Sequence, residues 1–176
     1  SQEFEELYPT LNDPNFSSKI AYKQEFQETK YNGNITDIEN EAEKYCSAEF
    51  ELNPNQIFIK NFLSNQTPYN GLLLYHGVGT GKTCSAIGIS EEIRSYNKQS
   101  KNTQRIIIVA SPNVQNNFKL QLFDETKLEL NGGYWNLKTC VGQNLIKEIN
   151  PTTMKDVPRE VIIRQINNII RTNYLF

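Results

Sequence analysis

The sequence is poor in the residues that bind metals or form disulfides. Among 176 residues there are one histidine and three cysteines, Cys46, Cys84 and Cys140, which are far apart and belong to no Cys-x-x-Cys pair. A disulfide framework or a zinc site needs paired or closely spaced ligands. The sequence therefore argues against both classes, and we expect free thiols in a reducing compartment.

Long apolar runs and an excess of positive charge are also absent. No run approaches the roughly 20 apolar residues of a membrane span, and the opening SQEFEELYP lacks the basic residues and apolar stretch of a signal peptide. The 18 Lys and Arg residues are balanced by 20 Asp and Glu, so the overall charge does not indicate nucleic-acid binding. We expect a soluble globular protein without membrane contact, in which any nucleic-acid site is local.

Two regions differ in composition. Residues 1–51 are polar and charged, with scattered aromatic residues and a turn signal at YNGN, and they predict a weakly packed N-terminal extension with a short helix from Ile38 to Phe50. From residue 52 the apolar positions become periodic, and Asn53-Pro54 predicts the start of a helix that reaches Ser64. We therefore divide the chain into an extension, 1–51, and the first part of a larger domain, 52–176.

Short apolar runs alternate with helical patterns in the second region. The runs LLLY at 72–75 and RIIIVA at 105–110 are typical of strands buried on both faces of a parallel sheet. A third strand is predicted from Trp135 to Val141, and helices are predicted over Lys82–Arg94, Val114–Phe123 and Arg159–Asn173. This alternation indicates an α/β fold in which helices flank a parallel sheet.

A glycine-rich loop, HGVGTGKT at 76–83, joins the first strand to the next helix. Glycines let successive backbone N–H groups face a phosphate, and the helix that follows adds donors. Lys82 supplies a charge for the β and γ phosphates, and Thr83 a hydroxyl for Mg²⁺, so both are predicted catalytic residues of an ATP site. The predicted cofactor-binding residues are Gln56, His76, Gly77, Val78, Gly79, Thr80, Gly81, Lys82, Thr83 and Cys84.

One position departs from the usual P-loop pattern, Gly-x-x-x-x-Gly-Lys-Ser/Thr. His76 stands where that pattern has its first glycine. We interpret His76 as a packing or hinge residue at the end of the strand rather than as a catalytic base. The side chain of Cys84 is also expected to pack.

Two further polar sites accompany the loop. Gln56 lies in the first turn of its predicted helix, and its amide both donates and accepts, which suits the edge of adenine; a glutamine on an exposed helix face is the alternative. Ser111-Pro112-Asn113 follows the second strand, at the edge where ligands approach open α/β sheets. These three residues are predicted either to contact a nucleic-acid phosphate or to cap the next helix.

The segment LLLYHGVGTGKTC resembles motif I of superfamily 2 helicases, and Gln56 resembles their upstream Q motif. The segments 72–86, IVASPNVQNNFKLQLF, CVG and EINP resemble helicases of large cytoplasmic DNA viruses, in particular relatives of the poxvirus early transcription factor small subunit and nucleoside triphosphatase I. The resemblance covers Leu52 to Phe176, and LYPTLNDPNFSSKIAYKQEF resembles the N-terminal lead-in of these proteins.

The resemblance implies a RecA-like domain that uses ATP and Mg²⁺ for movement on DNA or RNA. It implies viral transcription subunits as partners, and the virion or the host cytoplasm as location. By position, Lys82 and Thr83 would serve the phosphates and magnesium, Gln56 the adenine, and Ser111 to Asn113 the nucleic-acid backbone as motif Ia.

Hydrolysis in this class also needs an acidic motif II at the end of a strand. The one candidate, Asp124-Glu125, continues the helical period of Val114 and Phe118, so we interpret it as a solvated helix end. We therefore expect the chain to end before motif II and to bind ATP without turnover, within a parent protein that hydrolyses it. The alternative is a catalytically silent P-loop module that docks onto a viral transcription or virion complex.

Overall fold

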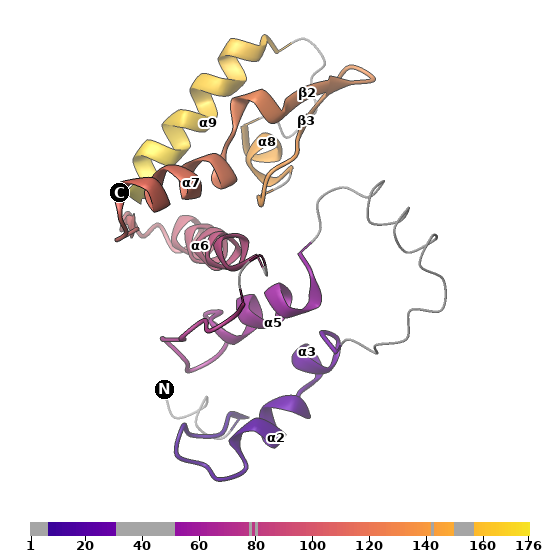
Figure 1. Ribbon diagram of the computed structural model, residues 1–176, viewed down its shortest axis with the longest axis vertical. Helices are drawn as coiled ribbons and strands as arrows, with labels where there is room; N and C mark the ends of the chain where they lie inside the picture. The colour runs from indigo at the N-terminus through magenta and orange to yellow at the C-terminus, as the bar shows by residue number, and fades with distance from the viewer. Residues whose placement is uncertain (1–6, 31–51, 78, 80, 142, 150–156) are drawn as a thin grey trace. The chain divides into compact units, whose positions relative to one another are not determined.

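The computed structural model describes residues 7–30, 52–77, 79, 81–141, 143–149 and 157–176 (Figure 1). These residues form two compact units, the first reaching Ile93 and the second beginning at Arg94. Helix α6, Lys82–Gln99, begins in the first unit and ends in the second. The helix expected from Ile38 to Phe50 lies outside the described residues.

Helix α5, Pro54–Phe62, starts at the predicted residue and ends two residues before the predicted Ser64. Its start is fixed by a capping box. The Asn53 side chain accepts the backbone N–H of Gln56 at 2.9 Å, and the Gln56 side chain accepts the backbone N–H of Asn53 at 2.9 Å. Two donors that the helix leaves unpaired are thereby satisfied, with proline at the first helical position.

The segment before α5 packs more closely than its composition suggests. It contains two short helices, α2, Phe16–Ala21, and α3, Gln24–Gln27, each with one buried apolar residue, Ile20 and Phe26. One core cluster of the first unit consists of Ile20, Phe26, Phe62 and Tyr69, with Tyr8, Phe16, Phe58 and Leu63 packed against it. The expectation of a weakly packed extension is therefore wrong for these residues, because their scattered aromatic rings converge on α5.

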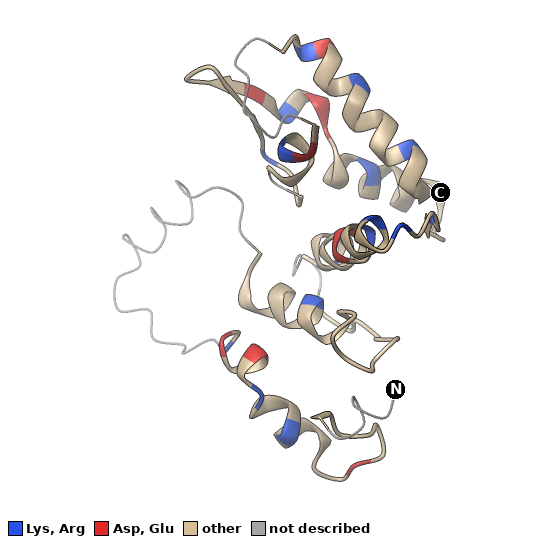
Figure 2. Cartoon of the chain, turned by 180° about the vertical axis from the view of Figure 1, so that it is seen from behind, with Lys and Arg blue, Asp and Glu red and all other residues tan. Residues whose placement is uncertain are grey.

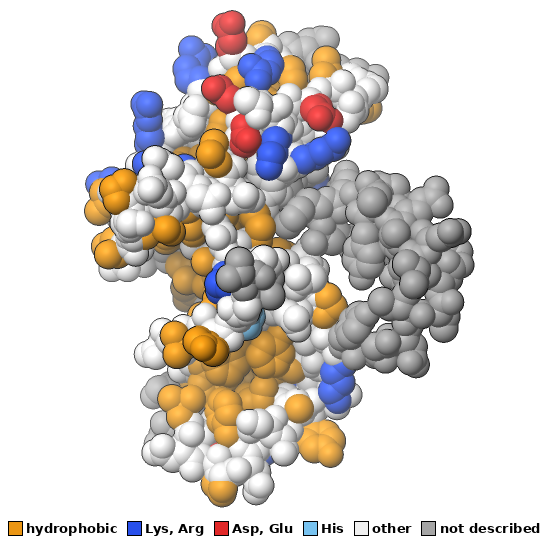
Figure 3. Space-filling model, in the orientation of Figure 1, with side chains coloured by type: hydrophobic (Ala, Val, Ile, Leu, Met, Phe, Trp, Pro, Cys, Tyr) orange, Lys and Arg blue, Asp and Glu red, His pale blue; other side chains and the backbone are white. Residues whose placement is uncertain are grey.

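Residues 72–75 do not form the buried strand that their sequence predicts. They carry no strand assignment, and the side chains of Leu73 and Tyr75 are 86% and 92% exposed. In the described part of the chain no strand pairs with these residues, and of their side chains only Leu74 is partly buried. Figure 3 shows hydrophobic side chains gathered on part of the face that it draws.

The predicted strand at 105–110 is present in shortened form. Strand β1, Ile106–Ile107, pairs in parallel with β4, Tyr174–Leu175, and the N–H of Ile108 extends the ladder to the carbonyl of Leu175 at 2.8 Å. The parallel pairing agrees with the predicted α/β class. Burial on both faces does not, since Ile107 is 65% and Val109 91% exposed where no other described strand or helix covers them.

The third predicted strand belongs to a different sheet. Strand β3, Tyr134–Leu137, pairs antiparallel with β2, Leu128–Asn131, and not with the parallel pair. Gly132 and Gly133 adopt φ values of 58° and 84°, which glycine tolerates and which a tight hairpin turn requires. The prediction from Trp135 to Val141 is therefore wrong in its partner and its end, because the double glycine favours a local hairpin.

Helices complete the second unit. They are α7, Pro112–Leu122, a 3-10 turn η1, Glu125–Lys127, α8, Asn144–Ile149, and α9, Arg159–Asn173, the last with the predicted bounds. Leu122, Leu137, Leu145, Ile162 and Ile166 are at most 1% exposed and form the core. Both basic and acidic positions are seen on these elements in Figure 2. Among the described residues, no helix has both the length and the apolar character that crossing a membrane requires.

Candidate nucleotide-binding site

The predicted P-loop follows residues 71–75, which form neither a helix nor a strand, and it runs into the start of α6 at Lys82. Gly79 and Gly81 have φ values of 82° and 80°, the left-handed region that side chains other than glycine rarely adopt. Val78 and Thr80 lie outside the described residues. The glycines at 79 and 81 are therefore used for their backbone conformation, as the motif predicts.

The Lys82 side chain folds back onto this loop. Its Nζ donates to the backbone carbonyl of His76 at 2.9 Å and to that of Gly77 at 2.6 Å. A charged phosphate oxygen is a stronger partner for an ammonium group than a neutral carbonyl. The first turn of α6 also directs its backbone N–H groups toward the loop, and a helix N-terminus favours anions. The arrangement can accept an anion that replaces the carbonyl contacts of Lys82.

Gln56 is brought directly against the loop. The residue is only 6% exposed, and its Nε2 donates to the backbone carbonyl of Gly81 at 3.3 Å while its amide oxygen belongs to the capping box. A Cβ atom added to Gly81 would lie 2.5 Å from Nε2. The alternative of a glutamine on an exposed helix face is thus wrong, and the contact between Gln56 and the loop, 25 residues apart, was not evident from sequence.

The remaining predicted loop residues take different positions. Thr83 and Cys84 are half-buried on the first turn of α6. The His76 side chain is exposed, so its predicted packing is wrong, and the structure uses its backbone carbonyl instead.

The second predicted site, Ser111 to Asn113, begins helix α7 in the second unit. Ser111 is the N-cap by backbone conformation, but its side chain makes no capping hydrogen bond, and all three residues are exposed. Gln115, which the sequence pattern did not single out, ties the segment between β1 and α7 to α7 by donating from Nε2 to the carbonyl of Ala110 at 2.8 Å. Ser111 to Asn113 thus form an exposed helix start after a strand.

Asp124, the one candidate for an acidic motif, has a structural role. Its carboxylate accepts the hydroxyl of Thr126 at 2.6 Å and the backbone N–H of Thr126 at 3.0 Å, and these bonds lower its pKa. It caps the 3-10 turn η1 after α7 has ended at Leu122. Within the described ranges no group of three or more His, Cys, Asp or Glu side chains is placed to hold a metal ion.

The known proteins that are similar to this chain in sequence are named as helicases. Two proteins of Acanthamoeba polyphaga mimivirus, both named "Putative ATP-dependent RNA helicase", are 34% and 30% identical over 116 residues, which cover 65% and 63% of this chain. A protein of Invertebrate iridescent virus 3 named "Putative helicase" is 31% identical over 128 residues, or 66% of the chain. The chain is therefore similar to proteins named as helicases in large DNA viruses.

The similarity concerns a small part of these relatives. The chain spans 18%, 10% and 12% of their respective lengths. No protein-family model matches the chain. No solved structure matches it either. 

Proposed function

We propose that Gln56 and the P-loop form the Mg-ATP site of a viral superfamily 2 helicase with a RecA-like fold. The observation that carries the proposal is the hydrogen bond from the Gln56 amide to the Gly81 carbonyl. It joins the residue expected to recognise adenine to the loop expected to hold the phosphates. The names of the similar viral proteins support ATP and a helicase class.

Each site residue has a chemical task in this proposal. The Lys82 ammonium exchanges two carbonyl partners for β and γ phosphate oxygens, which bind it more strongly. The Thr83 hydroxyl ligates the Mg²⁺ that accompanies ATP. Gln56 has a second Nε2 hydrogen, beyond the one given to Gly81, for an acceptor of the adenine ring. Backbone N–H groups of the loop and of α6, up to Cys84, surround the phosphates.

The proposal for the whole protein is ATP-driven movement on DNA or RNA, in viral transcription. Ser111 to Asn113 would contact the nucleic-acid backbone. Their side chains are exposed at the start of α7 and are therefore accessible to it. Viral transcription subunits are the proposed partners. The protein itself is proposed to be a relative of the poxvirus early transcription factor small subunit and nucleoside triphosphatase I. The virion or a viral factory in the host cytoplasm is the proposed location.

This chain alone is proposed to bind ATP without turnover. Hydrolysis needs a carboxylate that holds magnesium and orients water. Among the described residues the one candidate, Asp124, is held by Thr126 as the cap of η1. The same observation favours the second candidate function, a catalytically silent P-loop module that docks onto a viral transcription or virion complex.

Titration of the chain with Mg-ATP tests the proposal. Replacing Lys82 by alanine removes two charge-assisted contacts to phosphate, so the dissociation constant should rise by about 10- to 100-fold. The matched control is Lys127→Ala, at an exposed lysine of the second unit, which should bind Mg-ATP like the wild type. Equal affinities of the wild type and Lys82→Ala would contradict a P-loop role.

A further inference from the structure

Helix α5 has a second face, turned toward residues 7–30, which we call the N-terminal segment. Phe58 and Phe62, one helical turn apart, both contact Phe26 of α3, with ring centroids 4.8 Å and 6.3 Å away. Phe26 is only 2% exposed. Residues four apart lie on the same face of a helix, so this face of α5 is covered by the segment along a full turn.

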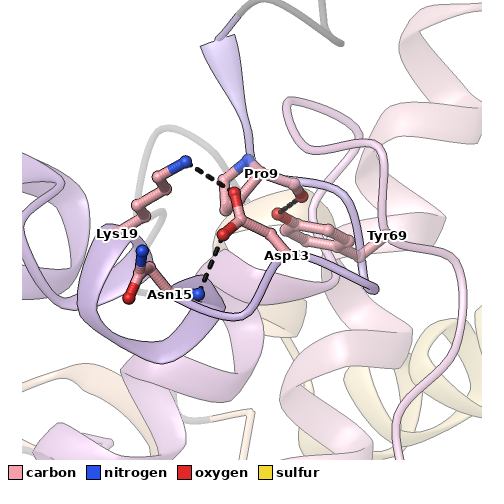
Figure 4. A network of polar contacts seen from close by, with 5 residues as sticks. All are labelled: Pro9, Asp13, Asn15, Lys19 and Tyr69. Carbon is pink, nitrogen blue, oxygen red and sulfur yellow. Dashed lines mark hydrogen bonds and ion pairs between the residues drawn. The ribbon is translucent and has the colours of Figure 1, made fainter.

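Tyr69 also holds the N-terminal segment next to α5. Its ring stacks on Phe62 with centroids 4.5 Å apart and planes inclined by 7°, while its hydroxyl donates to the carbonyl of Pro9 at 2.7 Å. Figure 4 shows this bond beside Asp13, which accepts from Lys19 at 2.6 Å and from the N–H of Asn15 at 2.8 Å. These hydrogen bonds therefore hold the turn before α2 in the place where it contacts Tyr69.

Polar bonds add direction to the aromatic contacts. The Asn61 Nδ2 donates to the backbone carbonyl of Glu25 at 3.0 Å, and the Tyr8 hydroxyl donates to the Glu25 carboxylate at 2.6 Å. Aromatic packing tolerates sliding, whereas a hydrogen bond weakens steeply when its distance or angle changes. The Asn61 bond therefore fixes the position of α5 against the segment, while the Tyr8 bond holds Glu25 in place within the segment.

We infer that the N-terminal segment is a positioning element for the nucleotide site, acting on Gln56 through α5. Gln56 lies five residues before Asn61 on the same rigid helix, and its bond to the Gly81 carbonyl is already 3.3 Å long. A shift of α5 by a few tenths of an ångström would break that bond. Residues Phe26, Asn61 and Tyr69 would thus govern adenine selectivity without touching the nucleotide, an inference that rests on the proposed role of Gln56.

The test is the ratio of dissociation constants for Mg-GTP and Mg-ATP, measured on the full chain. Gln56→Ala defines the ratio without the adenine contact, which we expect to be about tenfold below the wild type. Phe26→Ala should reach the same ratio, and Asn61→Ala should lower it by about threefold. Tyr22→Ala is the matched control, because Tyr22 is an aromatic residue of the same segment that is 78% exposed.

A general loss of folded protein lowers both affinities equally and leaves the ratio unchanged, so the ratio separates positioning from stability. If Phe26→Ala does not fold, Asn61→Ala and the milder Phe26→Leu give the ratio. Folded variants with the wild-type ratio would overturn the inference.

Amide exchange without nucleotide keeps the inference separate from the proposed function. The Gln56 N–H donates to the Asn53 side chain, and its exchange should be about tenfold faster in Phe26→Ala than in the wild type or Tyr22→Ala. Unchanged exchange would overturn the positioning role. A wild type that shows no preference for Mg-ATP, or a Gln56→Ala variant that keeps it, would instead contradict the adenine contact alone.

Discussion

In the first unit the core cluster around α5 consists mostly of aromatic rings, whereas the core side chains of the second unit are mostly Leu and Ile. The polar bonds differ too. The first unit joins its segments through tyrosine hydroxyls and amides, including Tyr8 to Glu25 and Asn61 to Glu25. The second unit has an ion pair of low exposure, Arg94 to Glu148 at 2.9 Å.

This difference bears on the site. The aromatic core of the first unit packs against the helix that carries Gln56, and its Tyr8 hydroxyl donates to Glu25, a bond that alkali breaks. The ion pairs of this unit, Lys19 with Asp13 and Lys60 with Glu92, lie at the surface and contribute little. The second unit depends on a charged pair. We therefore expect the two units to respond to opposite ends of the pH range.

The largest expected effect is in the second unit, on Glu148→Ala. The side chains of Arg94 and Glu148 are 7% and 22% exposed, so losing the carboxylate leaves a mostly buried charge, which costs roughly 2–3 kcal/mol of unfolding free energy. The matched control is Glu129→Ala, whose pair with Lys138 is exposed and is worth at most about 1 kcal/mol. Denaturant unfolding measures both, and equal losses would contradict the distinction.

The same pair gives a pH dependence. Burial alone would raise the pKa of Glu148, but the bonds and charges of Lys98 and Arg94 outweigh it and hold the pKa below its usual value. A depressed pKa stabilises the fold above the unfolded value, near 4.3, and this stabilisation is lost as pH falls through the folded value. The cost of Glu148→Ala should therefore shrink below about pH 4; a constant cost down to pH 2 would contradict the account.

The next effect is expected at the P-loop, on Gly81→Ala. Its φ of 80° disfavours a side chain by about 1–2 kcal/mol, and the new Cβ would also displace the Gln56 amide. Gly79→Ala has the same strain without any atom within 4 Å, so it is the matched control. The preference for Mg-ATP over Mg-GTP should fall in Gly81→Ala and be kept in Gly79→Ala. If both variants kept the same preference for Mg-ATP over Mg-GTP, the contact between Gln56 and Gly81 would not determine that preference.

The smallest effect is expected in the first unit, on Tyr8→Phe. Removing the hydroxyl bond to Glu25 costs about 0.5–1.5 kcal/mol near neutral pH. Burial, and then the bond to Glu25, raise the pKa of Tyr8 to about 12. A raised pKa stabilises the fold below the unfolded value, and this stabilisation is lost as pH rises through the folded value. The wild type should thus lose stability between pH 10 and pH 12 more steeply than Tyr8→Phe, and parallel curves in alkaline unfolding would argue against this.

Local sequence signals predicted the fold best. The cap at Asn53-Pro54 located the start of α5, and the periodicity of 159–173 gave both ends of α9, because these features depend on neighbouring residues. The apolar run at 72–75 predicted a strand that the structure lacks, since a strand needs a partner that the run does not specify. The same limit applied to residues 16–27, whose packing depends on Tyr69 and α5.

At the candidate site, too, the sequence predicted local features but not contacts between distant residues. Spacing alone located Gly79, Gly81 and Lys82, whose loop conformation is local. The contact of Gln56 with Gly81 spans 25 residues and that of Tyr69 with Pro9 spans 60, and no local pattern specifies either. The exposed side chain of His76 was also missed, because strand-end packing was assumed from a strand that is not formed.

The most direct test of the nucleotide site is the unfolding free energy with and without Mg-ATP. At roughly 100 times the dissociation constant, bound nucleotide should stabilise the wild-type chain by about 2.7 kcal/mol, and Lys82→Ala should gain almost nothing at the same concentration. Stabilisation that is absent from the wild type, or equal in the two proteins, would contradict nucleotide binding at this P-loop.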